Sequence, residues 1–241
     1  MGVCLVVGAG DGVGGAIARA FAKDGHEVCI TRRARNLEQL EELAQSIRDD
    51  GGKARAYGVD ARSEDEMIAL FDKIEREVGP LEIVIFNIGA NVRFELTETT
   101  SRVFQKVWEM ACFAGFLTGR EAARVMLPRG KGTILFTGAS ASLRGRQGFS
   151  AFSAAKQALR AVAQSAAKEL GPRGIHVAHV VVDGAIDGVF ARTNIPDRQE
   201  RVDRDDILKP EEIAANYVWL HKQQRSAWTH ELDLRPWSES W

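Results

Sequence analysis

The feature that most constrains the fold is a glycine-rich turn that directly follows a short apolar run at the start of the chain. Residues 3–7 (VCLVV) carry no charge, as is typical of a strand buried on both faces of a parallel sheet. Glycine then stands at Gly8, Gly10, Gly12 and Gly14, and a helical pattern follows. A strand that passes through such a turn into a helix predicts a β–α unit that can hold a phosphate.

Three glycines of this turn each have a distinct physical task. Gly8 permits the tight turn, Gly12 lets the backbone approach a pyrophosphate, and Gly14 allows the helix to pack closely on the strand. A turn that binds nothing would not need to bear the conformational cost of several glycines. We therefore predict a dinucleotide site that includes Gly8, Gly10, Asp11, Gly12, Val13 and Gly14.

Strand-like and helix-like segments alternate along the rest of the chain. The predicted strands are 3–7, 27–31, 54–59, 81–86, 132–137, 176–182 and a short last strand at 232–234. The predicted helices are 14–23, 37–49 with Asn36 as cap, one opened by a Ser63–Glu66 capping box and ending near 79–80, 100–126, 150–171 and 210–221. This alternation predicts one α/β domain over residues 1–241, a doubly wound parallel sheet of the Rossmann type. We expect a loop at 184–208 to line the substrate pocket, and a tail at 225–241, with Trp228, Trp237 and Trp241, to contact a partner subunit.

Composition excludes several classes of partner. The 32 basic and 33 acidic residues nearly cancel, and no long block of like charge points to nucleic acid or an anionic membrane surface. No apolar stretch reaches the roughly 20 residues of a membrane span, and the glycine turn begins too early to leave room for a signal peptide. The three cysteines form no CxxC pair, and the five histidines show no metal-ligand spacing. We expect a cytoplasmic protein without a metal.

The end of the second strand reports on the cofactor. A carboxylate there would bind the adenosine ribose of NAD, but this chain has Arg32 and Arg33, which suit the 2′-phosphate of NADP. NADP(H) is therefore preferred, with NAD(H) still possible. Asp11 complicates the prediction, because it either repels a 2′-phosphate or pairs with an arginine. Asp60 ends the third strand, where it either meets the adenine amino group or caps the following turn.

Several of these motifs together resemble the short-chain dehydrogenase/reductase family over nearly the whole chain. They are the glycine turn, Asp60, Phe86-Asn87-Ile88-Gly89, a serine-rich strand end and Phe152-xxx-Lys156. The resemblance implies that Lys156 holds the nicotinamide ribose, that Asn87 borders the cofactor beside Gly89, and that Ile186 lies against the nicotinamide amide. It also implies a homodimer or homotetramer built on the helices around 100–126 and 151–170.

The chain departs from that family at the positions that carry the chemistry. Phe152 stands where the family has its catalytic tyrosine, and a phenyl ring cannot donate a proton. Ala139 stands at the serine position with Ser140 next to it, and Cys112 aligns with the assisting asparagine. The usual Pro-Gly after the sixth strand is Asp183-Gly184. The chain's tyrosines, Tyr57 and Tyr217, lie in other elements and are no plausible replacement.

We therefore expect an NADP(H)-preferring oxidoreductase that acts on a small carbonyl or alcohol with a non-standard proton donor. Its catalytic residues would be Lys156 and Ser140, with Phe152 at the tyrosine position. The donor would be Lys156 itself, a water held by it, or one of Ser140, Ser142, Ser150, Asp183 and Asp187. The alternatives are a catalytically impaired cofactor-binding protein, acting as a sensor or a supporting subunit, and a lyase- or isomerase-like enzyme without net redox.

Overall fold

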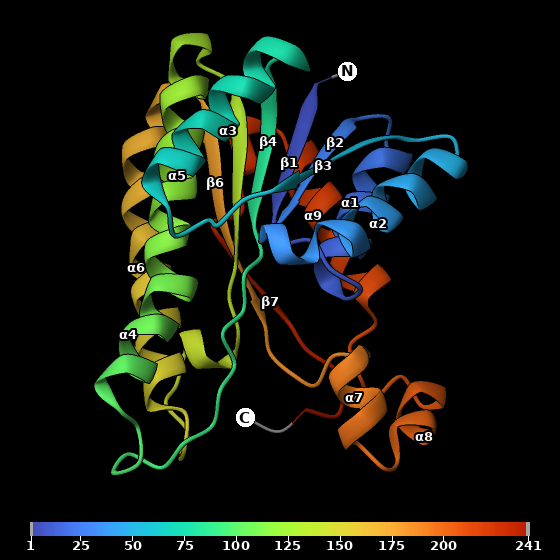
Figure 1. The fold of residues 1–241 in the computed structure, drawn as a ribbon, viewed down its shortest axis with the longest axis vertical. Coiled ribbons are helices and arrows are strands. Elements are labelled where there is room, and N and C mark those ends of the chain that lie inside the picture. The colour runs from blue at the N-terminus through green and yellow to red at the C-terminus, as the bar shows by residue number, and fades with distance from the viewer. Residues whose placement is uncertain (1, 240–241) are drawn as a thin grey trace.

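Seven parallel strands form one sheet in the order β3-β2-β1-β4-β5-β6-β7, as Figure 1 shows for the computed structural model, which describes residues 2–239. The order reverses between β1 and β4, and in such sheets ligands bind at the carboxyl ends of the strands beside that reversal. The predicted single α/β domain with a Rossmann-type sheet is confirmed. The strands are β1 Val3–Val7, β2 Glu27–Arg32, β3 Lys53–Gly58, β4 Leu81–Phe86, β5 Gly132–Thr137, β6 Ile175–Val182 and β7 Glu231–Leu234.

Helices cover both faces of the sheet and bury two apolar cores (Figure 1). On one face α1 Val13–Lys23, α2 Leu37–Asp49 and α9 Pro210–Lys222 pack on side chains such as Cys4 and Val6 of β1. On the other face lie α3 Glu64–Glu77, α5 Ala114–Met126 and α6 Ser150–Leu170. Because alternate residues of the central strands enter opposite cores, these strands are mostly apolar on both faces, which is the pattern that predicted them.

The long helix predicted at 100–126 has three parts. α4 Ser101–Trp108 is capped by the Thr100 hydroxyl, which accepts a hydrogen bond from Val103 N. A π-helical turn, Glu109–Phe113, then leads directly into α5. Such a turn adds one residue to the helix and is frequent at functional sites. It places Cys112 in a buried cluster against α6.

The segment 184–208 is not the plain loop that was predicted. It contains two six-residue helices, α7 Val189–Asn194 and α8 Arg198–Asp203. Ala191 is the one buried residue of α7, and α8 buries none. Helices this short and this exposed leave almost no apolar periodicity in the sequence, which is why the pattern did not reveal them.

Two predicted helix caps form only in part. Asn36 does precede α2, but it closes a 3₁₀ turn, Ala34–Asn36, and its side chain makes no capping hydrogen bond. Ser63 accepts a hydrogen bond from Glu66 N at 3.4 Å, as predicted. The Glu66 carboxylate, however, accepts from the backbone N of Asp60 at 2.9 Å, which ties the end of β3 to α3.

The tail contacts its own domain more than the sequence predicted. Trp228 stacks on His176 of β6, with ring centres 4.9 Å apart, so this residue packs within the chain. Trp237 is 79% exposed, and Trp241 lies outside the described residues. Within residues 2–239 no helix has the length and apolar character needed to cross a membrane.

Candidate active site

The glycine turn forms an open cradle at the amino end of α1. Gly8 has a φ of +95°, and a Cβ on Gly14 would collide with the carbonyl oxygen of Gly8. Gly12 precedes α1 without any side-chain cap, and nothing lies within 4 Å of the position that its Cβ would take. The first N–H groups of α1 are therefore available to an anion, and this geometry fits a dinucleotide pyrophosphate. Asn87 Nδ2 donates to Gly8 O at 3.1 Å and joins β4 to the turn.

A groove of about 270 Å³ lies beside this turn, at the carboxyl ends of β1 to β4. It brings together most of the predicted cofactor-binding residues: Gly8, Gly10, Arg32, Arg33, Asp60, Asn87 and Gly89. Arg32 reaches over the turn, with its guanidinium carbon 3.5 Å from where a Cβ on Gly10 would stand. The groove is thus basic on the β2 side and has one carboxylate, Asp60, at the end of β3.

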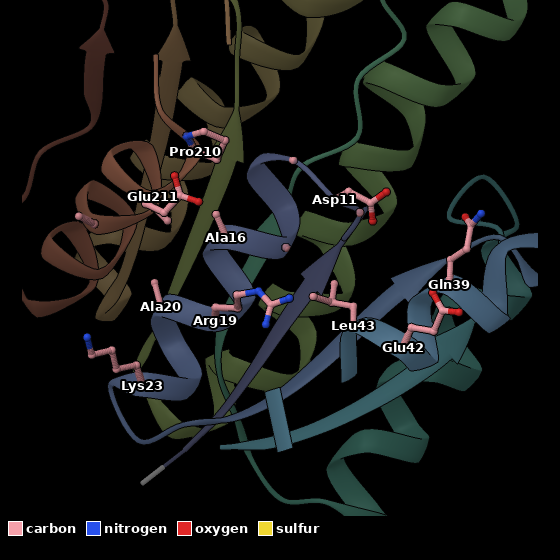
Figure 2. A pocket seen from close by; sticks show the side chains of 15 residues that line it. Asp11, Ala16, Arg19, Ala20, Lys23, Gln39, Glu42, Leu43, Pro210 and Glu211 are labelled. Carbon is pink, nitrogen blue, oxygen red and sulfur yellow. The ribbon is translucent and has the colours of Figure 1, made fainter. Parts of the chain in front are cut away.

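A larger groove of about 600 Å³ runs along the outer side of α1, between α2 and α9 (Figure 2). Asp11 lines this groove and not the basic one, so its carboxylate does not share a groove with Arg33. Val13, also predicted to contact the cofactor, begins α1 and is partly buried against the core. Ile186 likewise packs on the core and forms a parallel bridge with Leu208.

Lys156 is the most unusual titratable group near the glycine turn. Its side chain extends from α6 to the ends of two strands, where Nζ donates to Thr137 O at 2.8 Å and to Ile88 O at 3.1 Å. The residue is only 2% exposed. Burial disfavours the charged form and lowers the pKa of Lys156 to about 8, against a smaller opposite effect of Cys112.

The surroundings of Lys156 on the α4 side are apolar. Phe152 lies one turn before it on α6, with the ring centre 6.0 Å from Nζ. Phe152 and Cys112 belong to a buried cluster made of alanines, valine and these two side chains: Ala90, Val107, Ala111, Cys112, Ala141, Ala151, Phe152 and Ala155. Burial raises the pKa of the Cys112 thiol, which therefore stays protonated near neutral pH.

Asp183 follows β6 as a fully buried carboxylate that Arg144 binds directly and that Arg235 approaches to 3.6 Å. Arg144 donates from Nη1 and Nη2 to its two oxygens at 3.0 and 2.8 Å, and Ser140 adds a side-chain hydrogen bond. Burial alone would raise the pKa of Asp183, but the bonds from Arg144 and Ser140 hold it below its ordinary value. Asp183 is therefore ionised near neutral pH and is not a proton donor.

The remaining candidate donors are also engaged or enclosed. Ser142 is 1% exposed and accepts a hydrogen bond from Ala139 N at 3.1 Å. Asp187 is paired with Arg198, whose Nε lies 2.6 Å from its Oδ1. Ser150 Oγ is buried and makes no hydrogen bond to any described residue. None of these groups has the combination of an available proton and a shifted pKa that Lys156 has.

Two arginines of the site were not predicted from the sequence. Arg62 lines the basic groove, and Arg144 anchors Asp183. The spacing Asp60-x-Arg62 carries a weak signal, because an aspartate side chain often bonds the backbone two residues on. Arg144 lies 39 residues from Asp183, so only the folded chain reveals that pair. Within residues 2–239 no group of three or more His, Cys, Asp or Glu side chains is arranged to hold a metal ion.

Comparisons with known proteins place these features in a family. The family model described as short chain dehydrogenase matches residues 2–199. A solved short-chain dehydrogenase from Rhodopseudomonas palustris is 47% identical, with a TM-score of 0.84, over 98% of this chain and 99% of that one. The cis-4-hydroxycyclohexanecarboxylate dehydrogenase of Sinomonas cyclohexanicum is 30% identical over 222 residues, 90% of this chain and 88% of that protein. A metagenomic short-chain oxidoreductase solved in complex with NADP shares the fold, with a TM-score of 0.81 at 24% identity over 97% and 96% of the two chains.

The match extends over most of the chain and includes relatives at 30% identity or more, so the likeness is not one of fold alone. This chain belongs to the short-chain dehydrogenase/reductase family.

Proposed function

We propose that this protein transfers a hydride between NADP(H) and a small carbonyl or alcohol, with Lys156 as the proton donor in place of a tyrosine. The observation that carries the proposal is the pairing of an open phosphate cradle with a buried lysine whose pKa is about 8. In this proposal Phe152 stands at the position of the family's catalytic tyrosine and Ser140 beside that of its serine.

The basic groove supports a preference for NADP(H). Arg32 and Arg33 line it, and the end of β2 carries no carboxylate to bind a ribose 2′-hydroxyl. Guanidinium groups suit a 2′-phosphate because they form charge-assisted, often bidentate hydrogen bonds. Asp11, the acid that would oppose this charge, lines the other groove. When bound, NADPH would supply the hydride.

Lys156 has the chemistry of an acid at neutral pH. Two of its three N–H groups are used by the carbonyls of Thr137 and Ile88, and one remains for a substrate oxygen. In the reducing direction the carbonyl carbon gains the hydride and its oxygen takes the proton from the Lys156 ammonium. The neutral amine then recovers a proton from solvent. A pKa near the working pH suits a group that must both give and regain a proton.

The apolar cluster around Phe152 supports a small, largely apolar substrate.

Assembly into a homodimer or homotetramer is part of the same proposal. It is supported by aromatic side chains that α4 and α5 leave about 40% exposed: Phe104 42%, Trp108 40% and Phe116 41%. In the same proposal, the segment 184–208, which contains α7 and α8, covers the substrate. Its Phe190 side chain is 71% exposed and would contact the substrate.

Calorimetric titration with NADPH and NADH tests the cofactor half of the proposal. We expect micromolar binding of NADPH and much weaker binding of NADH. Arg32→Ala should weaken NADPH binding at least tenfold and leave NADH binding unchanged, because only NADPH carries the 2′-phosphate. Arg35→Ala is the matched control, since Arg35 is exposed and does not line the groove. Equal binding of both dinucleotides by the wild type would reject the preference.

Turnover with a panel of carbonyls and alcohols tests the chemical half. We expect oxidation of NADPH by at least one small ketone or aldehyde, and a loss of about 10²-fold in Lys156→Ala. Tight NADPH binding without turnover on any compound would instead identify a cofactor-binding protein. Conversion of a substrate with only catalytic amounts of cofactor would identify a lyase or isomerase.

A further inference from the structure

The segment that follows β4 leads from Lys156 to an arginine without a partner. Ile88, near its start, accepts a hydrogen bond from Lys156 Nζ at 3.1 Å. Ala90 and Val92 then pack in the apolar cluster that contains Phe152. Arg93 comes next and is exposed, and its side chain makes no hydrogen bond or ion pair with any residue in the described range 2–239.

Gly148 gives the Arg93 side chain a defined path. Gly148 lies two residues before α6 with a φ of +80°, a conformation that favours glycine. A Cβ at this position would stand 2.9 Å from Arg93 Cγ and 3.1 Å from Arg93 Nε, so the arginine stem runs over the bare backbone of Gly148. The two segments are also joined directly, because Phe94 N donates to Gly148 O at 2.9 Å. The Arg93 guanidinium is therefore held close to the beginning of α6, the helix that carries Phe152 and Lys156.

The charges around Arg93 favour an anion. α6 begins without a side-chain cap and has no acidic residue in its first turn, so its amino end adds a partial positive charge. Glu95, two residues after Arg93, is approached by Gln147 Nε2 at 3.5 Å. Asp183 and Asp187, which follow β6, are already paired with other arginines. Arg93 thus has an uncompensated charge beside the apolar cluster.

We propose that Arg93 binds a carboxylate of the substrate, so that the protein acts on oxo acids and the corresponding hydroxy acids. The fork of a guanidinium matches the two oxygens of a carboxylate, and one arginine balances one negative charge. The substrate carbonyl would lie at Lys156, its hydrocarbon part along the cluster of Val92 and Phe152, and its carboxylate at Arg93. The inference rests on the proposed function, since it names the class of substrate for the same site.

Matched pairs of ketones test the carboxylate with the wild-type protein. Each pair compares an oxo acid, such as 4-oxopentanoate or 5-oxohexanoate, with its primary amide, which has a similar size and no charge. With NADPH we expect kcat/KM to be at least tenfold higher for the acid in at least one pair, because a hydrogen bond to a charged group contributes a factor of about ten or more. Equal values for acid and amide in every pair would overturn the inference. A higher value for dihydroxyacetone phosphate than for every oxo acid would also overturn it, because the site would then be one for phosphate.

Arg93→Met tests the arginine, because methionine keeps much of the apolar stem and removes the charge. We expect the preference for the acid over its amide to fall at least tenfold in this variant, through a higher KM for the acid, and Arg93→Lys to restore part of it. Arg173→Met is the matched control, since Arg173 is exposed and lies just before β6, at the opposite edge of the sheet, and this variant should keep the wild-type preference. A preference that survives in Arg93→Met would rule out the role of Arg93.

The uncharged ketones separate this inference from the proposed function. If the wild type oxidises NADPH with none of the acids, amides or simple ketones, both fail together. If it reduces the amides and simple ketones as well as it reduces the acids, hydride transfer stands and only the carboxylate site fails.

Discussion

Lys156 and Phe152 lie one turn apart on α6, with the lysine Nζ 6.0 Å from the centre of the phenyl ring. A phenyl ring offers a buried ammonium a weak attraction but no proton and no hydrogen-bond acceptor. The lysine therefore relies on the carbonyls of Thr137 and Ile88, and its pKa falls to about 8. Burial in these surroundings brings the pKa of Lys156 close to the physiological range.

The pH dependence of turnover follows from that pKa. Carbonyl reduction needs the ammonium form, so its rate should fall as the pH rises through about 8. Alcohol oxidation needs the neutral amine, so its rate should rise through the same value. Steady-state rates measured in both directions between pH 6 and 10 check this prediction. Lys156→Arg stays charged throughout, so an inflection near pH 8 that persists in that variant would contradict the role of Lys156.

Restoring a hydroxyl should raise activity. Phe152→Tyr would place a phenol oxygen near Lys156 at a residue that is 8% exposed, so the added group must be tolerated in a nearly closed site. We expect kcat for carbonyl reduction to rise at least tenfold, because a positioned general acid contributes about 10²–10⁴-fold. Phe149→Tyr, one residue before α6 in the same apolar cluster, is the control and should not gain activity. A Phe152→Tyr variant that folds and shows no gain would contradict the prediction that a phenol at this position is a better general acid than Lys156 alone.

The sequence predicted the layered fold well because the strands and helices that build it carry a strong apolar period. A continuous apolar run marks β1, and a run interrupted only by Glu82 marks β4. The glycine turn marks the carboxyl end of β1, where the cradle forms. α7 and α8 were missed because they bury almost nothing, and the π-helical turn was missed because its apolar pattern continues that of α4 and α5. The apolar periodicity of a sequence indicates which residues are buried. α7 and α8 differ from a loop, and the π-helical turn differs from an α-helix, in backbone hydrogen bonds that this periodicity does not reveal.

The same limit applies to the site. Gly8, Arg32, Asp60 and Asn87 could be named from the sequence because each ends a strand or begins a turn, and parallel strands bring those ends together. The pairing of Arg144 with Asp183 depends on side-chain reach between β5 and β6, which no spacing encodes. The shifted pKa of Lys156 likewise depends on burial by residues from α4 and the strand ends. The sequence therefore indicated which residues lie at the site, whereas the protonation states of Lys156 and Asp183 depend on how the folded chain packs around them.

Alanine substitutions at Gly12 and Gly14 should affect different properties, the first NADPH binding and the second the stability of the fold. Gly12→Ala meets no protein atom within 4 Å, so we expect it to lower the free energy of unfolding less than Gly14→Ala does. Its methyl group would occupy the cradle, and NADPH binding should weaken at least tenfold. Gly14→Ala would collide with the Gly8 carbonyl, so the protein itself should be destabilised, by about 2 kcal/mol. Urea unfolding and calorimetry on both variants check the pair, and equal NADPH affinity in wild type and Gly12→Ala would contradict the cradle.

The ion pair between Arg144 and Asp183 should be asymmetric in its effect on stability. Asp183 is fully buried, whereas 43% of the Arg144 side chain is exposed. Removing Arg144 leaves a buried carboxylate with only Ser140 and the more distant Arg235, whose Nη2 lies 3.6 Å from Oδ2. Removing the aspartate leaves the Arg144 guanidinium free to turn to solvent. We expect Arg144→Ala to lower the free energy of unfolding by about 3 kcal/mol at pH 7 and Asp183→Ala by less.

Low pH should reduce the effect of Arg144→Ala. In the wild type the bonds from Arg144 hold the pKa of Asp183 below its ordinary value of 3.8, so their contribution is present above that pH and is lost as the pH falls through the folded pKa. In the variant the buried carboxyl would be protonated at higher pH than in the wild type, and protonation removes a charge that only Ser140 and the more distant Arg235 would still stabilise. The difference between the two proteins should therefore shrink when urea unfolding is repeated at pH 4. A difference of the same size at pH 4 and pH 7 would show that Arg144 stabilises the fold through packing and not through its charge.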